Sequence, residues 1–213
     1  FSAISFQGRD VLPDGEGLMD VEEDQSRQMA IIGPLLLGIH DALYEAVATY
    51  NGDGYSDAVR AQHSDRAAAC CIYDHAERAL MDRFDGTPGV NFLDRRGLHL
   101  LNYRDQALIR VKKVNGLGQH ANYQTLQQQD YDDEMPLLDL PEAAVRLYAG
   151  YQMDAAGAAI ERVMIVRQIG KDVIWTAQVT ATEAQAAWVD ITPERIPDTG
   201  RTDFEAARAR RGR

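Results

Sequence analysis

A short basic run in the middle of the chain, Ala107–Lys113, has the spacing to place positive charge on one face of a β-strand. Side chains alternate between the two faces of a strand, so Arg110 and Lys112 share one face and the apolar residues between them lie on the other. Lys113 follows directly and extends the charge. Because guanidinium and ammonium groups arranged in this way bind phosphate or carboxylate, we predict that these three residues form a binding face.

The polar segment just after this run adds groups that can move protons. His120 and Tyr123 are the predicted catalytic residues, and Asn122 between them is a further binding residue. In an enzymatic version, the basic residues hold a phosphate while His120 or Tyr123 transfers the proton. This arrangement resembles the basic sheets of small toxin ribonucleases, which work without a metal. We expect Tyr151 and Asp154 to lie near the same face.

Two alternatives to a catalytic face remain open. The basic run can be a solvated sheet surface that pairs with segment 130–142, which holds six acids and no base, since charge runs are most often solvated. The same surface can also bind a protein target and block it without catalysis.

The chain offers a poor set of metal ligands. Cys71 and His75 are four residues apart in a predicted helix, and His63 lies further back. Two ligands do not make a structural zinc site, which takes four. No glycine-rich nucleotide-binding motif follows a predicted strand. We therefore predict no metal and no cofactor.

Charge is unevenly distributed along the 213 residues, whose formal net charge is −11. A net charge of this sign argues against non-specific nucleic-acid binding. Residues 1–54 carry a net charge of −8, whereas residues 95–116 carry +5. We predict that the acidic segments shield the basic face in the free protein.

Cysteine use and hydropathy favour a reducing compartment. Cys70 and Cys71 are adjacent, and a disulfide between neighbours is strained. No uninterrupted apolar run approaches the roughly 20 residues that span a bilayer, and no signal peptide is evident. We expect a cytoplasmic protein without a membrane partner.

Hydrophobic spacing predicts helices in the first half of the chain and strands in the second. The predicted helices cover residues 26–50, in which Gly33-Pro34 marks either a kink or the true helix start, and residues 56–84, with Ser56 as the N-cap. The predicted strands are residues 98–103, 106–114, 144–153, 159–169 and 172–180. The expected fold class is α+β, with two long N-terminal helices packed on a mostly antiparallel sheet of about five strands.

The same patterns divide the chain into three parts. Residues 1–25 are polar and acidic, and we expect a flexible arm. Residues 26–190 form the single α+β domain. Residues 191–213 are rich in proline, glycine and arginine and are expected to form a flexible basic tail.

The stretch from Leu98 to Trp175 resembles a bacterial toxin-like family. The resemblance is carried by Ala107–Lys113, Ala121–Thr125, Leu137–Pro141, Gly150–Gly157 and Val173–Trp175. Members of this family are often encoded beside helix-turn-helix regulators fused to zincin-like peptidases of the ImmA/IrrE kind.

That neighbourhood implies the toxic half of a toxin–antitoxin or phage-defence pair. The implied partners are a cognate antitoxin or regulator protein and a nucleic-acid, replication or translation target. The competing hypothesis is a non-enzymatic interaction module or regulator from a phage or mobile element, in which the acidic arm engages a basic partner.

Overall fold

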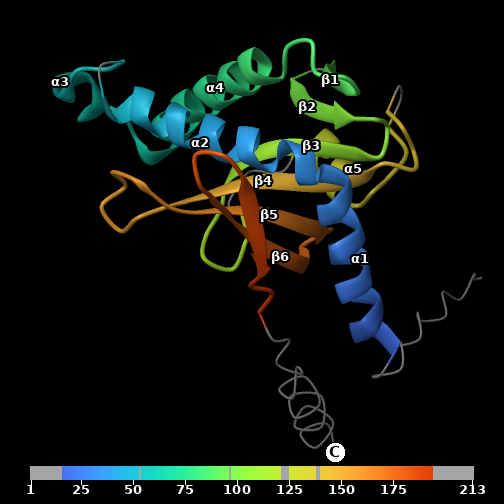
Figure 1. Cartoon of the computed structure of the whole chain (residues 1–213). Coiled ribbons are helices and arrows are strands. Elements are labelled where there is room, and N and C mark those ends of the chain that lie inside the picture. The colour runs from blue at the N-terminus through green and yellow to red at the C-terminus, as the bar shows by residue number, and fades with distance from the viewer. Residues whose placement is uncertain (1–15, 53, 96, 121–124, 138–139, 194–213) are drawn as a thin grey trace, which may run out of the picture.

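The computed structural model describes residues 16–52, 54–95, 97–120, 125–137 and 140–193. Its centre is one seven-stranded sheet with the strands in chain order (Figure 1). The strands are β1 Val90–Arg95, β2 Leu98–Tyr103, β3 Ala107–Lys113, β4 Val145–Met153, β5 Ile160–Ile169, β6 Asp172–Ala181 and β7 Ala186–Asp190. Neighbouring strands are antiparallel except for β3 and β4, which are parallel.

Three helices cover one face of the sheet. Helix α1 (Glu16–Ile32), a 3₁₀ turn η1 (Gly33–Leu35) and α2 (Leu36–Asn51) follow one another, and Figure 1 shows them as one bent rod. Helix α4 (Asp65–Phe84) lies beside α2, after the short α3 (Asp57–Arg60). Their apolar side chains join the inward residues of β2 to β6 in the larger core. We call this side of the sheet the helix face.

In the part of the chain that the structure describes, one short helix covers part of the opposite face. Parallel strands need a crossover connection, and the chain between β3 and β4 supplies one that contains α5 (Leu126–Asp132). Tyr131 of α5 packs with Leu108, Tyr148 and Met164 in a second, smaller core. We call this side of the sheet the α5 face.

The structure confirms the α+β class and the mostly antiparallel sheet, and it corrects the number of strands. The five predicted strands are β2 to β6, and the two additional ones, β1 and β7, are the edges of the sheet. Edge strands bury little of their surface, and the side chains of β1 and β7 are all half-buried or exposed. Their hydrophobic pattern is therefore weak.

The helical half also differs from the expectation. The kink at Gly33-Pro34 is present as the 3₁₀ turn, but α1 begins at Glu16, inside the segment expected to be an arm. The predicted second helix is divided: Ser56 precedes only the short α3, whereas Ser64 caps α4 by accepting a hydrogen bond from the backbone N–H of Ala67.

The ends of the chain lie largely outside the described residues, which begin at residue 16 and end at residue 193. The first residues of the expected tail are held by β6. Thr192 accepts a hydrogen bond through Oγ1 from the backbone N–H of Thr176, at 2.9 Å, and the N–H of Ile191 donates to the carbonyl of the same residue.

One helical segment, Val21–Asn51, is long and apolar enough to cross a membrane by length and composition. The core accounts for this hydropathy, because Met29, Ile32, Ile39 and Leu43 are almost fully buried between the helices and the sheet. Core helices of globular proteins pass the same test.

Candidate functional site

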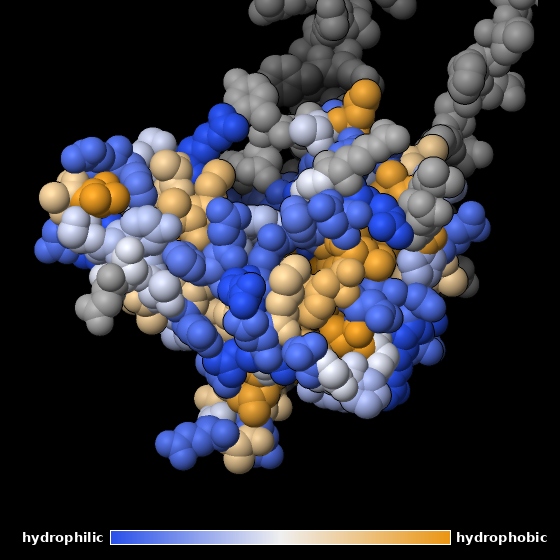
Figure 2. Space-filling view, turned by 90° about the horizontal axis from the view of Figure 1, so that it is seen from above, coloured by the Kyte–Doolittle hydropathy of each residue, from blue (hydrophilic) through white to orange (hydrophobic). Residues whose placement is uncertain are grey.

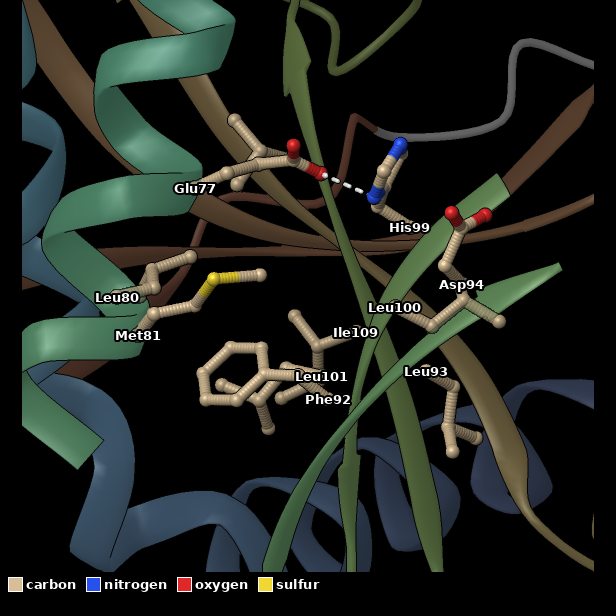
Figure 3. Close-up of a pocket in the computed structure, with 11 residues that line it drawn as sticks. Glu77, Leu80, Met81, Phe92, Leu93, Asp94, His99, Leu100, Leu101 and Ile109 are labelled. Atoms are coloured by element: carbon tan, nitrogen blue, oxygen red, sulfur yellow. Dashed lines mark ion pairs between the residues drawn. The ribbon is translucent and has the colours of Figure 1, made fainter. Parts of the chain in front are cut away.

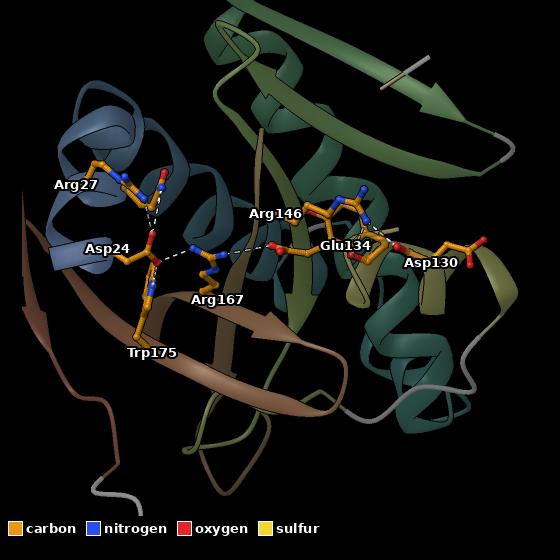
Figure 4. Close-up of polar contacts among 9 residues, drawn as sticks. Asp24, Arg27, Asp130, Glu134, Arg146, Arg167 and Trp175 are labelled. Atoms are coloured by element: carbon orange, nitrogen blue, oxygen red, sulfur yellow. Dashed lines mark hydrogen bonds and ion pairs between the residues drawn. The ribbon is translucent and has the colours of Figure 1, made fainter. Parts of the chain in front are cut away.

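Helix α5 lies over the side of β3 and β4 that carries the basic residues. Its N-terminus is capped by Thr125, whose Oγ1 accepts a hydrogen bond from the N–H of Gln128 at 3.3 Å. At its other end, the buried guanidinium of Arg146 donates to the carbonyls of Asp130, at 2.6 Å, and Tyr131, at 2.9 Å (Figure 4). These contacts fix α5 on the sheet because they satisfy backbone groups that a helix end leaves unpaired.

A chain of buried hydrogen bonds joins α5 to the strands. The side-chain amide of Gln128 donates to Asp132 Oδ1 at 2.8 Å and to the hydroxyl of Tyr148 at 2.6 Å. Its carbonyl oxygen accepts from Arg110, and Tyr148 donates to Asp132. Asp132 is 1% exposed, so this carboxylate is held by hydrogen bonds rather than by water.

Lys112 is buried beside these hydrogen bonds and is only 9% exposed. Burial and the positive charge of Arg110 together lower the pKa of its ammonium group from 10.5 to about 7, and the negative charge of Asp132 opposes this shift. A lysine with a pKa near neutrality exchanges its proton at physiological pH, which an ordinary surface lysine does not.

His120 lies at the end of the loop that follows β3. Its ring contacts the ring of Tyr148, with the centroids 4.9 Å apart. Both ring nitrogens are buried and have no hydrogen-bond partner among the residues that the structure describes. Burial and the neighbouring charge of Lys112 lower the pKa of His120, so the ring is neutral at pH 7.

Arg110 connects this cluster with the other face of the sheet. The ladder between β2 and β3 ends at the pair Leu101–Ile109, so β3 leaves β2 at the position where Arg110 follows. On the helix face, the charge of Arg110 lowers the pKa of the Tyr73 hydroxyl of α4, although burial and the bond to Glu77 keep that pKa above its usual value. The same guanidinium therefore influences groups on both sides of the sheet.

We define the acid–base cluster as Arg110, Lys112, His120, Gln128, Asp132 and Tyr148. It contains three of the residues that the sequence predicted, and burial replaces the open basic surface that we expected. Part of the alternative in which the basic run pairs with the acidic segment 130–142 is also present. Asp132 comes from that segment, and its negative charge opposes the lowering of the pKa of Lys112.

Three predicted site residues lie elsewhere. Lys113 is exposed at the end of β3, and Tyr151 is buried in the core of the helix face. Asp154 shapes the turn between β4 and β5, where its carboxylate accepts the N–H of Ala158 at 2.7 Å. The remaining two, Asn122 and Tyr123, lie outside the described residues.

Sequence reasoning missed Gln128, Asp132 and Tyr148. Tyr148 carried a usable signal, since alternation along β4 places it on the side opposite to its apolar neighbours. Gln128 and Asp132 are four residues apart and therefore share one side of α5, but only the crossover of the chain brings that side to the basic strand.

A second polar cluster holds α1 to the sheet and contains none of the predicted site residues. Asp24 accepts hydrogen bonds from Trp175 Nε1, at 2.9 Å, and from Arg167 (Figure 4). Burial opposes ionisation, but these bonds and the charge of Arg167 leave the pKa of Asp24 below its usual value. Arg167 also pairs with Glu134 at 3.4 Å. The cluster is an anchor between chain segments.

The described part of the chain contains no group of three or more histidine, cysteine, aspartate or glutamate residues arranged to hold a metal ion. Cys70 and Cys71 are free thiols. The side chains of the acid–base cluster can transfer protons and bind anions.

The chain was compared with protein-family models, with curated proteins and with solved structures, and nothing matches in any of the three comparisons.

Proposed function

We propose that this chain is a toxin-like effector of a bacterial toxin–antitoxin or phage-defence system. In this proposal, the acid–base cluster acts on a phosphate-bearing nucleic acid, in the cytoplasm, and a partner protein neutralises the effector. The observation that carries the proposal is the placement of Lys112, with a pKa of about 7, close enough to Arg110 and His120 for their charges to interact on one side of the sheet. Strongly shifted titratable groups gather at functional sites more often than elsewhere.

Each residue of the cluster has a chemical role in this proposal. Arg110 supplies a permanent positive charge, and its hydrogen bond to Gln128 fixes its direction. The neutral amine of Lys112 accepts a proton from the attacking hydroxyl. His120 donates the proton that the leaving oxygen needs, after protonation in the presence of the anion.

A non-enzymatic interaction module is the second candidate, and the burial of the cluster favours it. Lys112 and Asp132 are both largely withdrawn from solvent beneath α5. A buried polar network can serve to fix the position of a helix instead of reacting with a substrate. In that case the cluster holds α5 in place, and the outer surface of the domain does the binding.

Replacement of Lys112 by methionine separates the two candidates. Lys112→Met removes the titrating amine and keeps most of its volume. We expect a loss of toxicity in a bacterial host and a loss of at least 100-fold in the cleavage rate of labelled RNA or DNA by the purified protein, since general acid–base catalysis contributes roughly 10²–10⁴-fold.

The matched control is Lys171→Met, at the exposed turn between β5 and β6. This variant loses the same charge outside the cluster, and we expect it to keep full activity. Circular dichroism must show that both variants are folded. A purified wild-type protein that cleaves neither RNA nor DNA, together with undiminished toxicity of folded Lys112→Met, would rule out the enzymatic proposal.

A further inference from the structure

Strand β1 is an open edge of the sheet. Among the described residues its only strand partner is β2. Besides that ladder, the N–H of Val90 donates to the carbonyl of Thr87, and the carbonyl of Asp94 accepts from the Arg95 side chain. Its apolar residues Phe92 and Leu93 are only half-buried. Natural sheets usually protect such an edge with charge, proline or a covering segment. An edge that combines free backbone groups with half-buried apolar side chains is suited to pairing with another strand.

A pocket lies beside this edge, between α4 and the β1–β2 hairpin (Figure 3). Leu80 and Met81 of α4 form one wall, and Phe92 of β1 points into the space between them and the sheet. Met81 is 38% exposed, which is unusual for a large apolar side chain on a helix that faces the core. Figure 2 views the molecule from this side, where apolar areas lie between hydrophilic residues.

The polar end of the pocket is acidic. Glu77 of α4 lies there 3.7 Å from the imidazole of His99, and Asp94 of β1 lines the same end (Figure 3). Glu77 is also hydrogen-bonded by the hydroxyl of Tyr73. Glu77 is already engaged by His99 and Tyr73, and burial raises its pKa, so the exposed carboxylate of Asp94 is the group that favours a cation at this end.

We propose that β1 and this pocket together bind an extended segment of a partner protein, which adds to the sheet as an eighth strand and places an apolar and a basic side chain beside the pocket. The identification of this partner with the neutralising protein rests on the proposed function, but the docking site rests on its own geometry. Strand addition supplies affinity through backbone hydrogen bonds and specificity through alternate side chains.

The register of β1 predicts the sequence of the docking segment. Phe92 and Asp94 are two residues apart on the side of the sheet that faces α4, and an added strand lies about 4.8 Å away. The residue opposite Phe92 is therefore apolar and contacts Met81, and the residue opposite Asp94 is lysine or arginine. The residue between these two faces the other side, next to the half-buried Leu93, and is apolar as well.

The test uses the full chain and a fluorescein-labelled heptapeptide, Thr-Leu-Val-Lys-Val-Leu-Thr, measured by fluorescence anisotropy. This sequence reads the same in both directions, so it fits the predicted register in either strand orientation. We expect saturable binding that is at least tenfold weaker when lysine is replaced by glutamate in the peptide. Met81→Lys in the protein should weaken binding at least tenfold, since it fills the rim of the pocket and repels the peptide lysine. Met135→Lys is the matched control, because that methionine is 52% exposed and lies outside the pocket.

Two N-methylated peptides test strand pairing directly. Methyl groups on alternate amides block one edge of the peptide and leave the other edge free. We expect one of the two patterns to abolish binding and the other to preserve it, with shifts of the β1 backbone amides in nuclear magnetic resonance spectra. The proposal is overturned if the unmodified peptide does not bind, if both methylated peptides bind equally well, or if Met81→Lys binds like Met135→Lys.

The outcome is independent of catalysis. Lys112→Met lies outside the pocket and should bind the peptide with wild-type affinity. Peptide binding without nucleic-acid cleavage would leave the docking site standing and remove the enzymatic proposal. Nucleic-acid cleavage without peptide binding would leave the enzymatic proposal standing and remove the docking site.

Discussion

The two faces of the sheet are built from different chemistry, although the same strands supply both. The helix face is packed by apolar side chains from three helices. The α5 face carries a smaller apolar core and, next to it, Arg110, Lys112, Gln128 and Asp132. Adjacent residues of β4 show the contrast, because Leu147 belongs to the helix face and Tyr148 to the α5 face.

This difference separates apolar packing that stabilises the fold from buried charge that does not. Burial of apolar surface stabilises a fold at roughly 25 cal/mol per Å², without demands on hydrogen-bond geometry. Burial of charged groups costs free energy unless each is paired, and apolar replacements are often neutral or stabilising. If α5 served only to cover β3 and β4, a buried lysine with a lowered pKa would add nothing to the stability of the fold. The α5 face therefore carries the stronger case for function.

The largest effect is expected on the helix face. Leu147 is fully buried there, so Leu147→Ala leaves a cavity and should lower the free energy of unfolding by about 3 kcal/mol. The loss should be the same at pH 7.5 and pH 9.5, since no titrating group of the acid–base cluster lies on that side. Chemical denaturation at both pH values measures it. A loss that differs strongly between the two would show that the faces are energetically coupled.

The next effect belongs to the α5 face and depends on pH. The pKa of Lys112 is about 7 in the folded protein and 10.5 by reference in the unfolded chain. Between these two pKa values, Lys112 carries a proton in the unfolded chain but not in the folded protein. The free energy of unfolding therefore rises with pH, by at most about 1.4 kcal/mol per pH unit. Below pH 7 both states are protonated, and the full cost of burying the charge is present.

Lys112→Met removes this dependence. We expect the variant to be at least as stable as the wild type at pH 7.5 and to lose its relative advantage, by roughly 2 kcal/mol, as the pH rises to 9.5. Denaturation curves of the two proteins across this window measure the difference. If the free energies of unfolding of the two proteins changed with pH in parallel, Lys112 would not be desolvated. The two faces would then not differ in their electrostatics.

The extent to which the sequence predicts this molecule differs between local and long-range features. Alternation along β3 correctly separates Arg110 and Lys112 from their apolar neighbours, because period-two patterns record which side of a sheet is buried. The central strands follow from the same signal. The two edge strands do not, since β1 and β7 are half-buried and their patterns are incomplete.

The composition of the candidate site depends on contacts between distant parts of the chain. His120 and Asp132 join Lys112 only because the crossover between β3 and β4 folds back over the sheet. The helix caps show the same limit on a smaller scale. Ser56 and Ser64 are equally good N-cap residues by type, but only the hydroxyl of Ser64 accepts a hydrogen bond from its helix. Residue type identifies candidates, and the tertiary structure selects among them.

The smallest expected effect concerns the N-caps of two helices that lie on opposite faces of the sheet. Ser64→Ala removes the cap of α4, and Thr125→Ala removes the cap of α5. Each should cost about 1 kcal/mol of stability, the usual value for an N-cap hydroxyl. Only Thr125→Ala should also change the titration of Lys112, because the capped N–H belongs to Gln128, whose side chain bonds Arg110 and Asp132.

Denaturation at pH 7.5 measures the two stability losses, and the pH dependence of unfolding for each variant measures the titration. If Ser64→Ala altered the pH profile as much as Thr125→Ala, the helix face would share the electrostatics of the cluster. The connection would then run through Arg110, whose charge affects the pKa of Tyr73 of α4 on one side and whose side chain hydrogen-bonds Gln128 of α5 on the other. A profile unchanged in both variants would show instead that the cluster holds its geometry without help from the α5 cap.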